Sequence, residues 1–223
     1  MRIIQLHLLT ADLVSQRDFY TRVLGLAPVE EAGALALQVG SSRLVFRPTH
    51  PTEQAVYHFA FDIPQNRFRE AKAWIAGRVP LLRDASGADA FSSENWNSDS
   101  VYFRDPAGNI LEFIARHGLA NDSDQPFTEQ SILSISEIGL ATDNVADTVS
   151  LLQAELGAGI YDGVGSETFT AVGDEHGLLI VVKRGRIWFP DTGQPAELSP
   201  VLITVLDGTG RRHSVFGPPY QVV

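Results

Sequence analysis

Apolar residues along the chain alternate between a strand-like and a helix-like spacing. Residues 2–9 (RIIQLHLL) are dense in branched and apolar side chains, which predicts a strand. In residues 10–25, Leu13, Phe19, Tyr20 and Val23 recur at helical spacing between a Thr/Asp cap and Gly25, which predicts a helix. Residues 34–48 (ALALQVGSSRLVFRP) then contain two apolar runs around a GSS turn and predict two more strands.

The same order of elements recurs in the next part of the chain. Residues 56–63 (VYHFAFDI) predict a strand, and residues 64–77 (PQNRFREAKAWIAG) predict a helix with proline at its start and glycine at its end. Residues 100–116 (SVYFRDPAGNILEFIAR) predict a hairpin that turns at DPAG. Strand, helix and further strands therefore occur twice.

A third copy follows a polar stretch with the composition of a domain boundary. Residues 135–157 align with residues 3–25 without a gap at a constant offset of 132, so that Thr142 matches Thr10 and Gly157 matches Gly25. A fourth copy is reduced to the strand PVLITVL at residues 200–206. Repeats of this kind indicate similar units that bury one another's apolar faces.

Composition and charge narrow the possible partners. The 223 residues include 27 acidic and 17 basic side chains, and the net charge of −10 disfavours nucleic acid and anionic membranes as partners. The chain has no cysteine, so a metal would be held by histidine and carboxylate groups. No apolar run approaches the roughly 20 residues that span a bilayer, and the start lacks a cleavable leader. We therefore expect a soluble, cytoplasmic protein.

Comparison of the units singles out three residues of metal-ligand type. His7 and His58 occupy matching places on the first strands of two units, where the third unit has Gly139. Glu112 lies between apolar neighbours on the last strand of the second unit, where the first unit has Val45. A buried carboxylate there needs a cation or a donor, and two histidines with one carboxylate can hold a divalent ion on one face. Taken singly, a histidine on a strand is more often a hydrogen-bonded core or edge residue than a metal ligand.

Three stretches resemble the vicinal oxygen chelate superfamily, which includes glyoxalase I, the bleomycin and fosfomycin resistance proteins and the extradiol dioxygenases. They are HLLTADLVSQRDFYTRVLGL, YHFAFDI and VYFRDPAGNILEF. The resemblance implies an α+β fold in which tandem βαβββ units form a cup-shaped mixed sheet, with His7, His58 and Glu112 as metal ligands. It divides the chain into a metal-binding domain at 1–118, a linker at 119–131 and a degenerate copy at 132–223. That copy is expected to be metal-free, because Gly139 and Ile180 fill the matching places.

The resemblance leaves several activities open. Tyr102 lies ten residues before Glu112, as in the extradiol signature, and is expected to bind substrate if it is catalytic; a half-buried structural tyrosine is the alternative. The acid-base histidine of that signature is missing, since Ser93, Glu94 and Asn95 occupy its window. The ion could be Fe, Mn, Zn, Ni or Co. We rank dioxygenase chemistry ahead of lyase, isomerase or fosfomycin-type transferase chemistry, and a non-catalytic protein of the bleomycin-resistance type remains an alternative.

The loop before the hairpin is the expected wall of the substrate site. It combines aromatic surface with amide donors, as a small-molecule site requires. Its residues are Phe91, Asn95, Trp96 and Asn97. The expected partner is a small molecule with neighbouring oxygen atoms, and a homodimer is possible because units of this family pair within or between chains.

Overall fold

Four units follow one another along the chain in the computed structural model, which describes residues 1–50, 52 and 55–223. The first unit contains β1 (Arg2–Thr10), α1 (Leu13–Asp18), the π-helical η1 (Phe19–Val23), β2 (Pro28–Val29), β3 (Leu35–Val39) and β4 (Ser42–Pro48). The second contains β5 (His58–Ile63), the 3-10 turn η2 (Gln65–Arg67), α2 (Phe68–Ala76), β6 (Phe91–Ser93), β7 (Ser98–Arg104) and β8 (Ile110–Arg116). The predicted order of elements is confirmed for both units.

The later units follow the same plan with losses. A 3-10 turn η3 (Glu129–Ser131) precedes β9 (Ser134–Thr142), α3 (Val145–Leu156), β10 (Ile160–Gly165), β11 (Phe169–Asp174) and β12 (Gly177–Lys183). The fourth unit contains β13 (Val201–Leu206), β14 (Arg212–Gly217) and β15 (Gln221–Val222). Residues 184–223 are all described and form no helix, so the fourth unit is a reduced copy. The α+β fold of tandem units is confirmed.

Short-range hydrogen bonds begin and end the helices where the sequence predicts. Asp12 caps α1 by accepting from the backbone N–H groups of Val14 at 3.0 Å and Ser15 at 2.9 Å. Asn144 caps α3 in the same way through the N–H of Asp147 at 3.2 Å. Gly157 ends α3 with a φ of 63°, a conformation that glycine adopts without steric cost.

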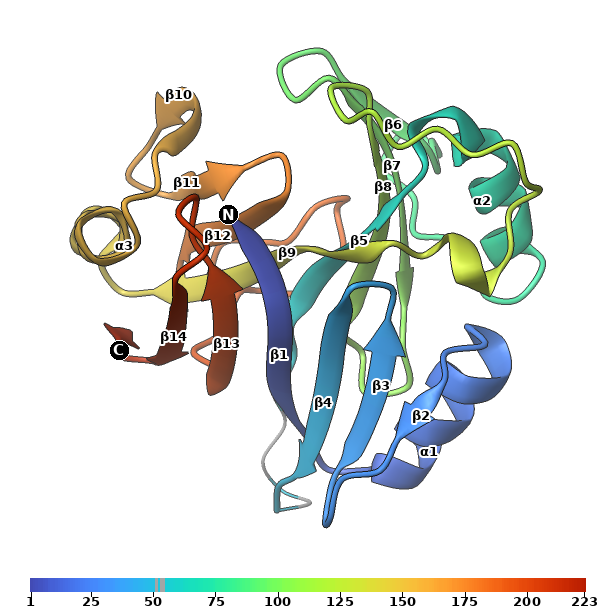
Figure 1. Cartoon of the computed structure of the whole chain (residues 1–223), viewed down its shortest axis with the longest axis horizontal. Coiled ribbons are helices and arrows are strands. Elements are labelled where there is room, and N and C mark those ends of the chain that lie inside the picture. Colours follow the sequence, from blue (N-terminus) through green and yellow to red (C-terminus); the bar gives the residue numbers. More distant parts are fainter. Residues whose placement is uncertain (51, 53–54) are drawn as a thin grey trace.

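The units pair in an order that the sequence does not indicate. Along the sheet the strands run β15-β14-β13-β1-β9-β5-β8-β7-β6, so β9 of the third unit lies between β1 and β5 (Figure 1). The first unit extends its sheet through β13 of the fourth, and the second extends its sheet through β9 of the third. The cup that contains His58 is therefore built by the second and third units, across the expected division at residues 119–131.

Strand register identifies the equivalent positions in the three full units. The parallel strand pairs match Gln5 with Arg43, His58 with Ile110, and Glu137 with Leu178. In each pair the second residue lies two positions before Val45, Glu112 and Ile180, respectively. His58 is therefore equivalent to Gln5 and Glu137, and the comparison that matches it with His7 and Gly139 is wrong by two residues. A shift of two keeps side chains on the same face of a strand, so the hydrophobic pattern does not reveal it.

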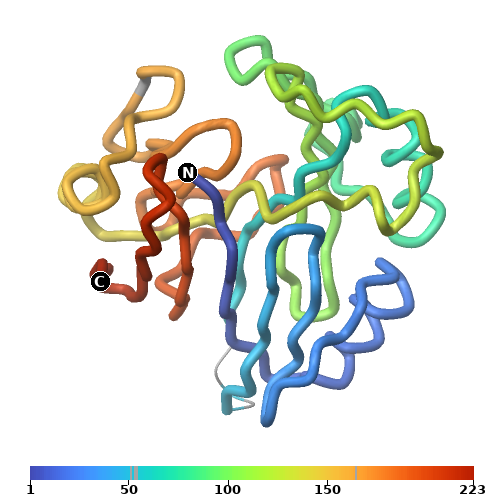
Figure 2. The backbone as a smooth tube through the Cα atoms, viewed as in Figure 1, coloured from blue at the N-terminus to red at the C-terminus, as the bar shows by residue number. Residues whose placement is uncertain are grey.

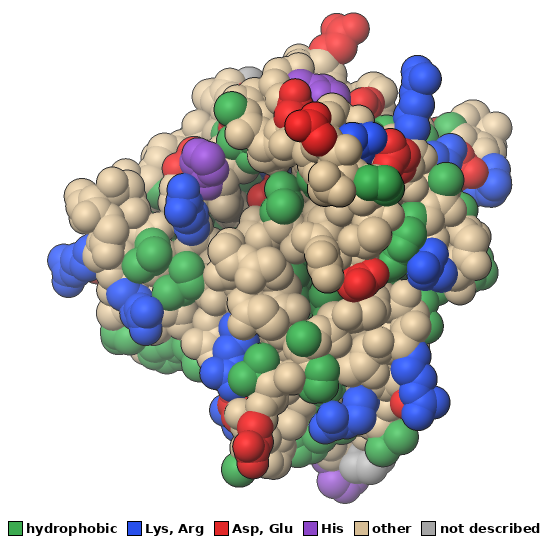
Figure 3. All heavy atoms as spheres, turned by 45° about the vertical axis from the view of Figure 1, so that its right-hand side comes forward, with side chains coloured by type: hydrophobic (Ala, Val, Ile, Leu, Met, Phe, Trp, Pro, Cys, Tyr) green, Lys and Arg blue, Asp and Glu red, His purple; other side chains and the backbone are tan. Residues whose placement is uncertain are grey.

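The N-terminus lies beside the third unit in both ribbon and tube views (Figures 1 and 2). There the amino group of Met1 forms an ion pair with Asp174 at the end of β11. On the face shown in Figure 3, hydrophobic side chains are scattered among polar ones, because the large apolar residues are in the core. Within the described ranges, no helix combines the length and apolar character needed to cross a membrane.

Candidate metal centre

The cup of the second and third units holds a buried cluster of one histidine and two glutamates. His58 begins β5, Glu112 lies on the neighbouring β8, and Glu137 lies on β9 on the other side of β5. One ligand atom from each lies within 4.8 Å of the other two, and all three residues are buried. Two ligands of one ion at 2.0–2.2 Å are at most about 4.4 Å apart, so small side-chain movements would bring all three onto an ion.

The hydrogen bonding of His58 leaves one ring nitrogen directed at the cluster. Its Nδ1 lies 3.1 Å from the carbonyl oxygen of Ile110, which can only accept, so Nδ1 carries the proton. Burial lowers the pKa of His58 to about 4, so the ring is neutral at neutral pH and Nε2 keeps its lone pair. Nε2 lies 3.6 Å from Glu112 Oε2. A lone pair facing a carboxylate needs a proton or a cation between them, and this orientation is the one that metal-binding histidines adopt.

The charges around the cluster also fit a divalent cation. Burial raises the pKa of Glu112 well above its ordinary value, and the nearby Glu137 carboxylate raises it further. Burial likewise raises the pKa of Glu137. Arg116 forms an ion pair with Glu137 and lies 3.9 Å from the buried carboxylate of Asp62. Three ionised carboxylates against one guanidinium would leave an excess of two negative charges, which a divalent ion would neutralise.

Arg116 fixes the position of Glu137 from below the cup. It is fully buried at the end of β8, and its Nε also donates to Ser136 Oγ at 3.2 Å. Burial lowers the pKa of Arg116, but the Glu137 and Asp62 carboxylates raise it more, so the guanidinium stays charged. The pair engages Glu137 Oε1.

A cavity of about 200 Å³ opens above the cluster. Its floor includes the three cluster residues, and its walls are mainly aromatic and serine side chains. The wall residues used below are Trp96, Tyr102, Phe169, Arg186, Trp188 and Phe189. The site thus combines a polar floor with a narrow apolar wall, as small-molecule sites commonly do.

Tyr102 lies on β7 opposite Glu112 on β8. Burial raises the pKa of Tyr102 well above its ordinary value, and the Glu112 charge raises it further, so the phenol remains protonated. Its ring is 6.1 Å from the His58 ring, and Ser100 Oγ donates to its hydroxyl at 3.3 Å. The structure therefore places the Tyr102 hydroxyl as a donor beside the cluster.

The predicted wall residues divide between the cavity and the surface. Trp96 lines the cavity, and its indole N–H donates to Asp162 at 3.1 Å. Phe91 supports the wall from behind, with its ring 5.7 Å from Tyr102. Asn95 and Asn97 are exposed in the turn between β6 and β7, outside the cavity lining. Both residues are part of this turn, in which Asn97 adopts a φ of 44°.

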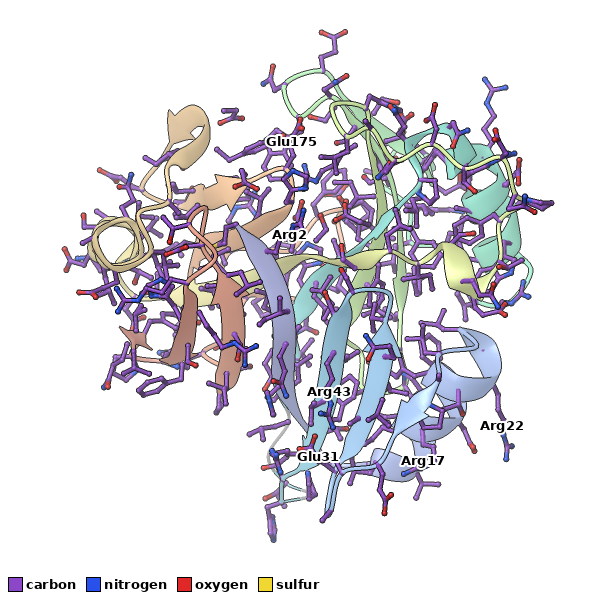
Figure 4. All side chains as sticks on the ribbon, in the orientation of Figure 1. Arg2, Arg17, Arg22, Glu31, Arg43 and Glu175 are labelled. Atoms are coloured by element: carbon purple, nitrogen blue, oxygen red, sulfur yellow. The ribbon has the colours of Figure 1, made fainter. Side chains whose placement is uncertain are left out.

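His7 is not part of the cluster. It lies on β1 beside Val45 of β4 and Leu202 of β13, in the cup of the first and fourth units. Burial and the charge of Arg47 lower its pKa, and Glu31 and Arg43 are the other charged groups that act on it. Glu31 and Arg43 are seen in the region of β4 in Figure 4, away from the second unit. The expectation that His7 joins His58 and Glu112 is corrected, because β9 separates the strands that carry the two histidines.

Glu137 replaces His7 as the third candidate ligand. The argument that selects Glu112, a carboxylate within an apolar predicted strand, applies also to Glu137 in SISEIGLAT, although one of its neighbours is Ser136. The constant offset of 132 also maps it onto Gln5, another polar residue in an apolar run. The third unit therefore contributes to the site, and the expectation that it lacks a ligand needs this correction.

Comparisons with known proteins identify the fold. No family model and no curated protein matches the sequence. A proposed dioxygenase from Bacillus subtilis subsp. subtilis str. 168 is similar in structure with a TM-score of 0.60 and 21% identity, over 82% of this chain and 63% of that one. The chain thus spans less than two thirds of that protein's length.

Glyoxalase I is similar in structure over almost the full length of the chain. Two variants of the enzyme from Zea mays give TM-scores of 0.57 and 0.55 at 12% identity, over 100% and 98% of this chain and 92% of theirs. At these identities the likeness concerns the fold, and the full-length matches agree with tandem copies of one domain. The chain therefore has the fold of glyoxalase I.

Proposed function

We propose that this chain is a divalent-metal-dependent enzyme that binds a small substrate through two neighbouring oxygen atoms and carries out lyase or isomerase chemistry. The proposal rests on the convergence of His58, Glu112 and Glu137 on the floor of one cavity. Three protein ligands leave positions open for a substrate. A bound divalent ion would act as a Lewis acid on the substrate oxygens.

The residues of the chain would divide the remaining tasks. Neutral His58 cannot donate a proton from Nε2, so its role is to bind the ion. Tyr102 keeps its proton and can donate a hydrogen bond to a substrate oxygen on which negative charge develops. Trp188, whose ring is 5.1 Å from the His58 ring, covers the site and helps to exclude water.

The ligand set favours Lewis-acid chemistry over oxygen activation, which reverses the ranking from the sequence. Ferrous oxygenases of the facial-triad type use two histidines and one carboxylate. The cluster described here has one histidine and two carboxylates, because His7 lies in the other cup. The similar folds do not decide between these reactions, since they include both a proposed dioxygenase and glyoxalase I.

Metal binding is the first test. The purified protein, stripped with a chelator, would be titrated calorimetrically with Zn²⁺, Mn²⁺, Ni²⁺ and Co²⁺. We expect one ion per chain, and we expect Glu137→Gln and His58→Gln to weaken binding by more than the roughly 10- to 100-fold typical of outer-shell partners. His7→Gln is the matched control, since it removes a histidine outside the cluster. Equal losses in His7→Gln and His58→Gln would contradict the assignment.

The reaction class needs a second assay. The metal-loaded protein would be tested for isomerisation of 2-oxoaldehyde thiol adducts and, separately, for oxygen uptake with vicinal ring diols. We expect turnover only in the first kind of reaction and a slower rate in Tyr102→Phe with metal still bound. Oxygen uptake that depends on Glu112 would show that dioxygenase chemistry is correct instead.

A further inference from the structure

Arg186 is a half-buried cation on the wall of the cavity above the cluster. Among the described residues, no carboxylate lies within ion-pair distance of its guanidinium. Its Nη1 reaches only the carbonyl oxygen of Ile187, at 3.5 Å. Arg116, the other arginine near the site, by contrast has an anionic partner, because it forms an ion pair with Glu137. Burial without a counter-charge lowers the pKa of Arg186.

The backbone holds Arg186 firmly over the cavity. Its N–H donates to Lys183 O at 3.0 Å, and its carbonyl accepts from Ala196 N–H at 2.8 Å. Gly185 N–H donates to Ala196 O at 2.8 Å, and Ile187 forms a β-bridge with Pro195. The segment after β12 is therefore a fixed ribbon, and its arginine and Trp188 both line the cavity.

The guanidinium shares the cavity with several aromatic rings. Its central carbon lies 5.0 Å from the centre of the Phe169 ring. Trp96, Trp188 and Phe189 complete this wall. The N–H groups of a guanidinium lie in its own plane, and two of them can bind a carboxylate through parallel hydrogen bonds.

The cavity volume limits the ligand. An engineered apolar cavity of about 150 Å³ holds one benzene molecule. The cavity here measures about 200 Å³ and has room for a single ring with a few substituents. Flat aromatic walls favour a planar ligand, since rings in contact stack with an offset or edge to face.

We infer that Arg186 determines substrate specificity by selecting a small planar molecule that carries a carboxylate. One end of this molecule would offer two neighbouring oxygens to the ion, and the carboxylate would pair with Arg186. The inference rests on the proposed function and deepens it by naming the charge and size of the substrate. It also explains why the arginine is left unpaired in a chain whose net charge is −10, where carboxylate partners are abundant.

A matched pair of chelating rings tests the inference on the metal-loaded full chain. Pyromeconic acid is a neutral hydroxypyranone with adjacent oxygens, and comenic acid is the same ring with a carboxylate across it. A charge-assisted pair is worth enough to make comenate bind about tenfold tighter or more. In Arg186→Gln this preference should vanish, while the affinities for pyromeconic acid and for the metal stay unchanged.

Arg184→Gln is the control, because this neighbouring arginine is half exposed and pairs with Glu197 at 3.4 Å. It should keep the preference for comenate. Equal affinities of the wild type for the two rings, or loss of the preference in both variants, would overturn the inference. Failure of both rings to bind the metal-loaded protein would overturn it and leave the metal site standing, whereas failure to bind metal at all would overturn the proposed function together with it.

Discussion

Replacing Gly139 by alanine is expected to destabilise the protein by displacing Trp188 from the metal cavity. A Cβ atom at Gly139 would lie 2.5 Å from Trp188 Cη2 and 3.0 Å from Cζ2, where ordinary contacts are 3.4–4 Å. The Trp188 side chain is buried and cannot move aside freely. Overpacking of this kind costs about 1–3 kcal/mol.

The backbone itself does not oppose the substitution. Gly139 lies within β9 and does not have a positive φ, so alanine can adopt its conformation. Alanine in a strand is favoured over glycine by roughly 0.5–1 kcal/mol. The expected net effect of Gly139→Ala is thus a loss of about 0–2.5 kcal/mol, which follows from the difference between the two effects.

A double-mutant cycle separates the contact from the backbone effect. Trp188→Phe removes the two ring atoms that the new Cβ would meet but leaves the His58 carbonyl oxygen at 3.3 Å. In that background Gly139→Ala should therefore lie within about 1 kcal/mol of neutral. The measurement is urea unfolding followed by far-ultraviolet circular dichroism on the four proteins without metal. An equal effect of Gly139→Ala in both backgrounds, within about 0.5 kcal/mol, would refute the explanation that this glycine makes room for the tryptophan.

Three further substitutions test other parts of the structure. Tyr20→Phe removes the hydroxyl that donates to buried Asp105 at 2.9 Å and should cost about 1–3 kcal/mol in urea unfolding, unlike an exposed tyrosine. Arg116→Met leaves two buried carboxylates without their cation and should lower the free energy of unfolding by about 3–5 kcal/mol at pH 7.5. The loss should be smaller at acidic pH, where the carboxylates take up protons. An unchanged urea midpoint at pH 7.5 would contradict the pairing. Hydrogen bonds from Thr209 lower the pKa of Asp207, so this carboxylate stabilises the fold above its ordinary value of 3.8 and the stabilisation is lost as the pH falls through the folded value. The melting temperature of Asp207→Asn should therefore lie below that of the wild type at pH 7 and approach it below pH 3.8; a constant difference would contradict this account.

Much of the fold follows from local patterns. The cap at Asp12 and the glycine at position 157, which matches Gly25, mark helices that the structure confirms, because these signals act within one turn of the chain. The helix predicted over residues 10–25 is present but divides into α1 and the π-helical η1. The gapless offset between the first and third units also holds, since β1 and β9 have the same length of nine residues.

The pairing of units could not be obtained in the same way. Each full unit offers a similar apolar sheet edge, so the hydrophobic pattern permits the second unit to pair with the first or with the third. Contacts far apart in sequence decide between them, such as Ser42 Oγ accepting from Ile135 N–H at 3.0 Å. The four wall residues Phe91, Asn95, Trp96 and Asn97 are assigned to the site by their proximity in sequence, and His7 by comparison of the units, but of these five only Trp96 lines the cavity.

The pairing of unlike units explains why the site is asymmetric. In the cup of the second and third units, the equivalent places hold His58 and Glu137 on the first strands, and Glu112 and Ile180 on the last strands. Four ligands would enclose an ion, whereas the apolar Ile180 leaves one side of the floor open toward the wall that carries Trp188 and Arg186. Two identical units could not provide both a polar floor and an apolar, cationic wall, because each side chain would then occur at both equivalent positions of the cup. Divergence between the second and third copies therefore allows one cavity to have a polar floor on one side and an apolar, cationic wall on the other.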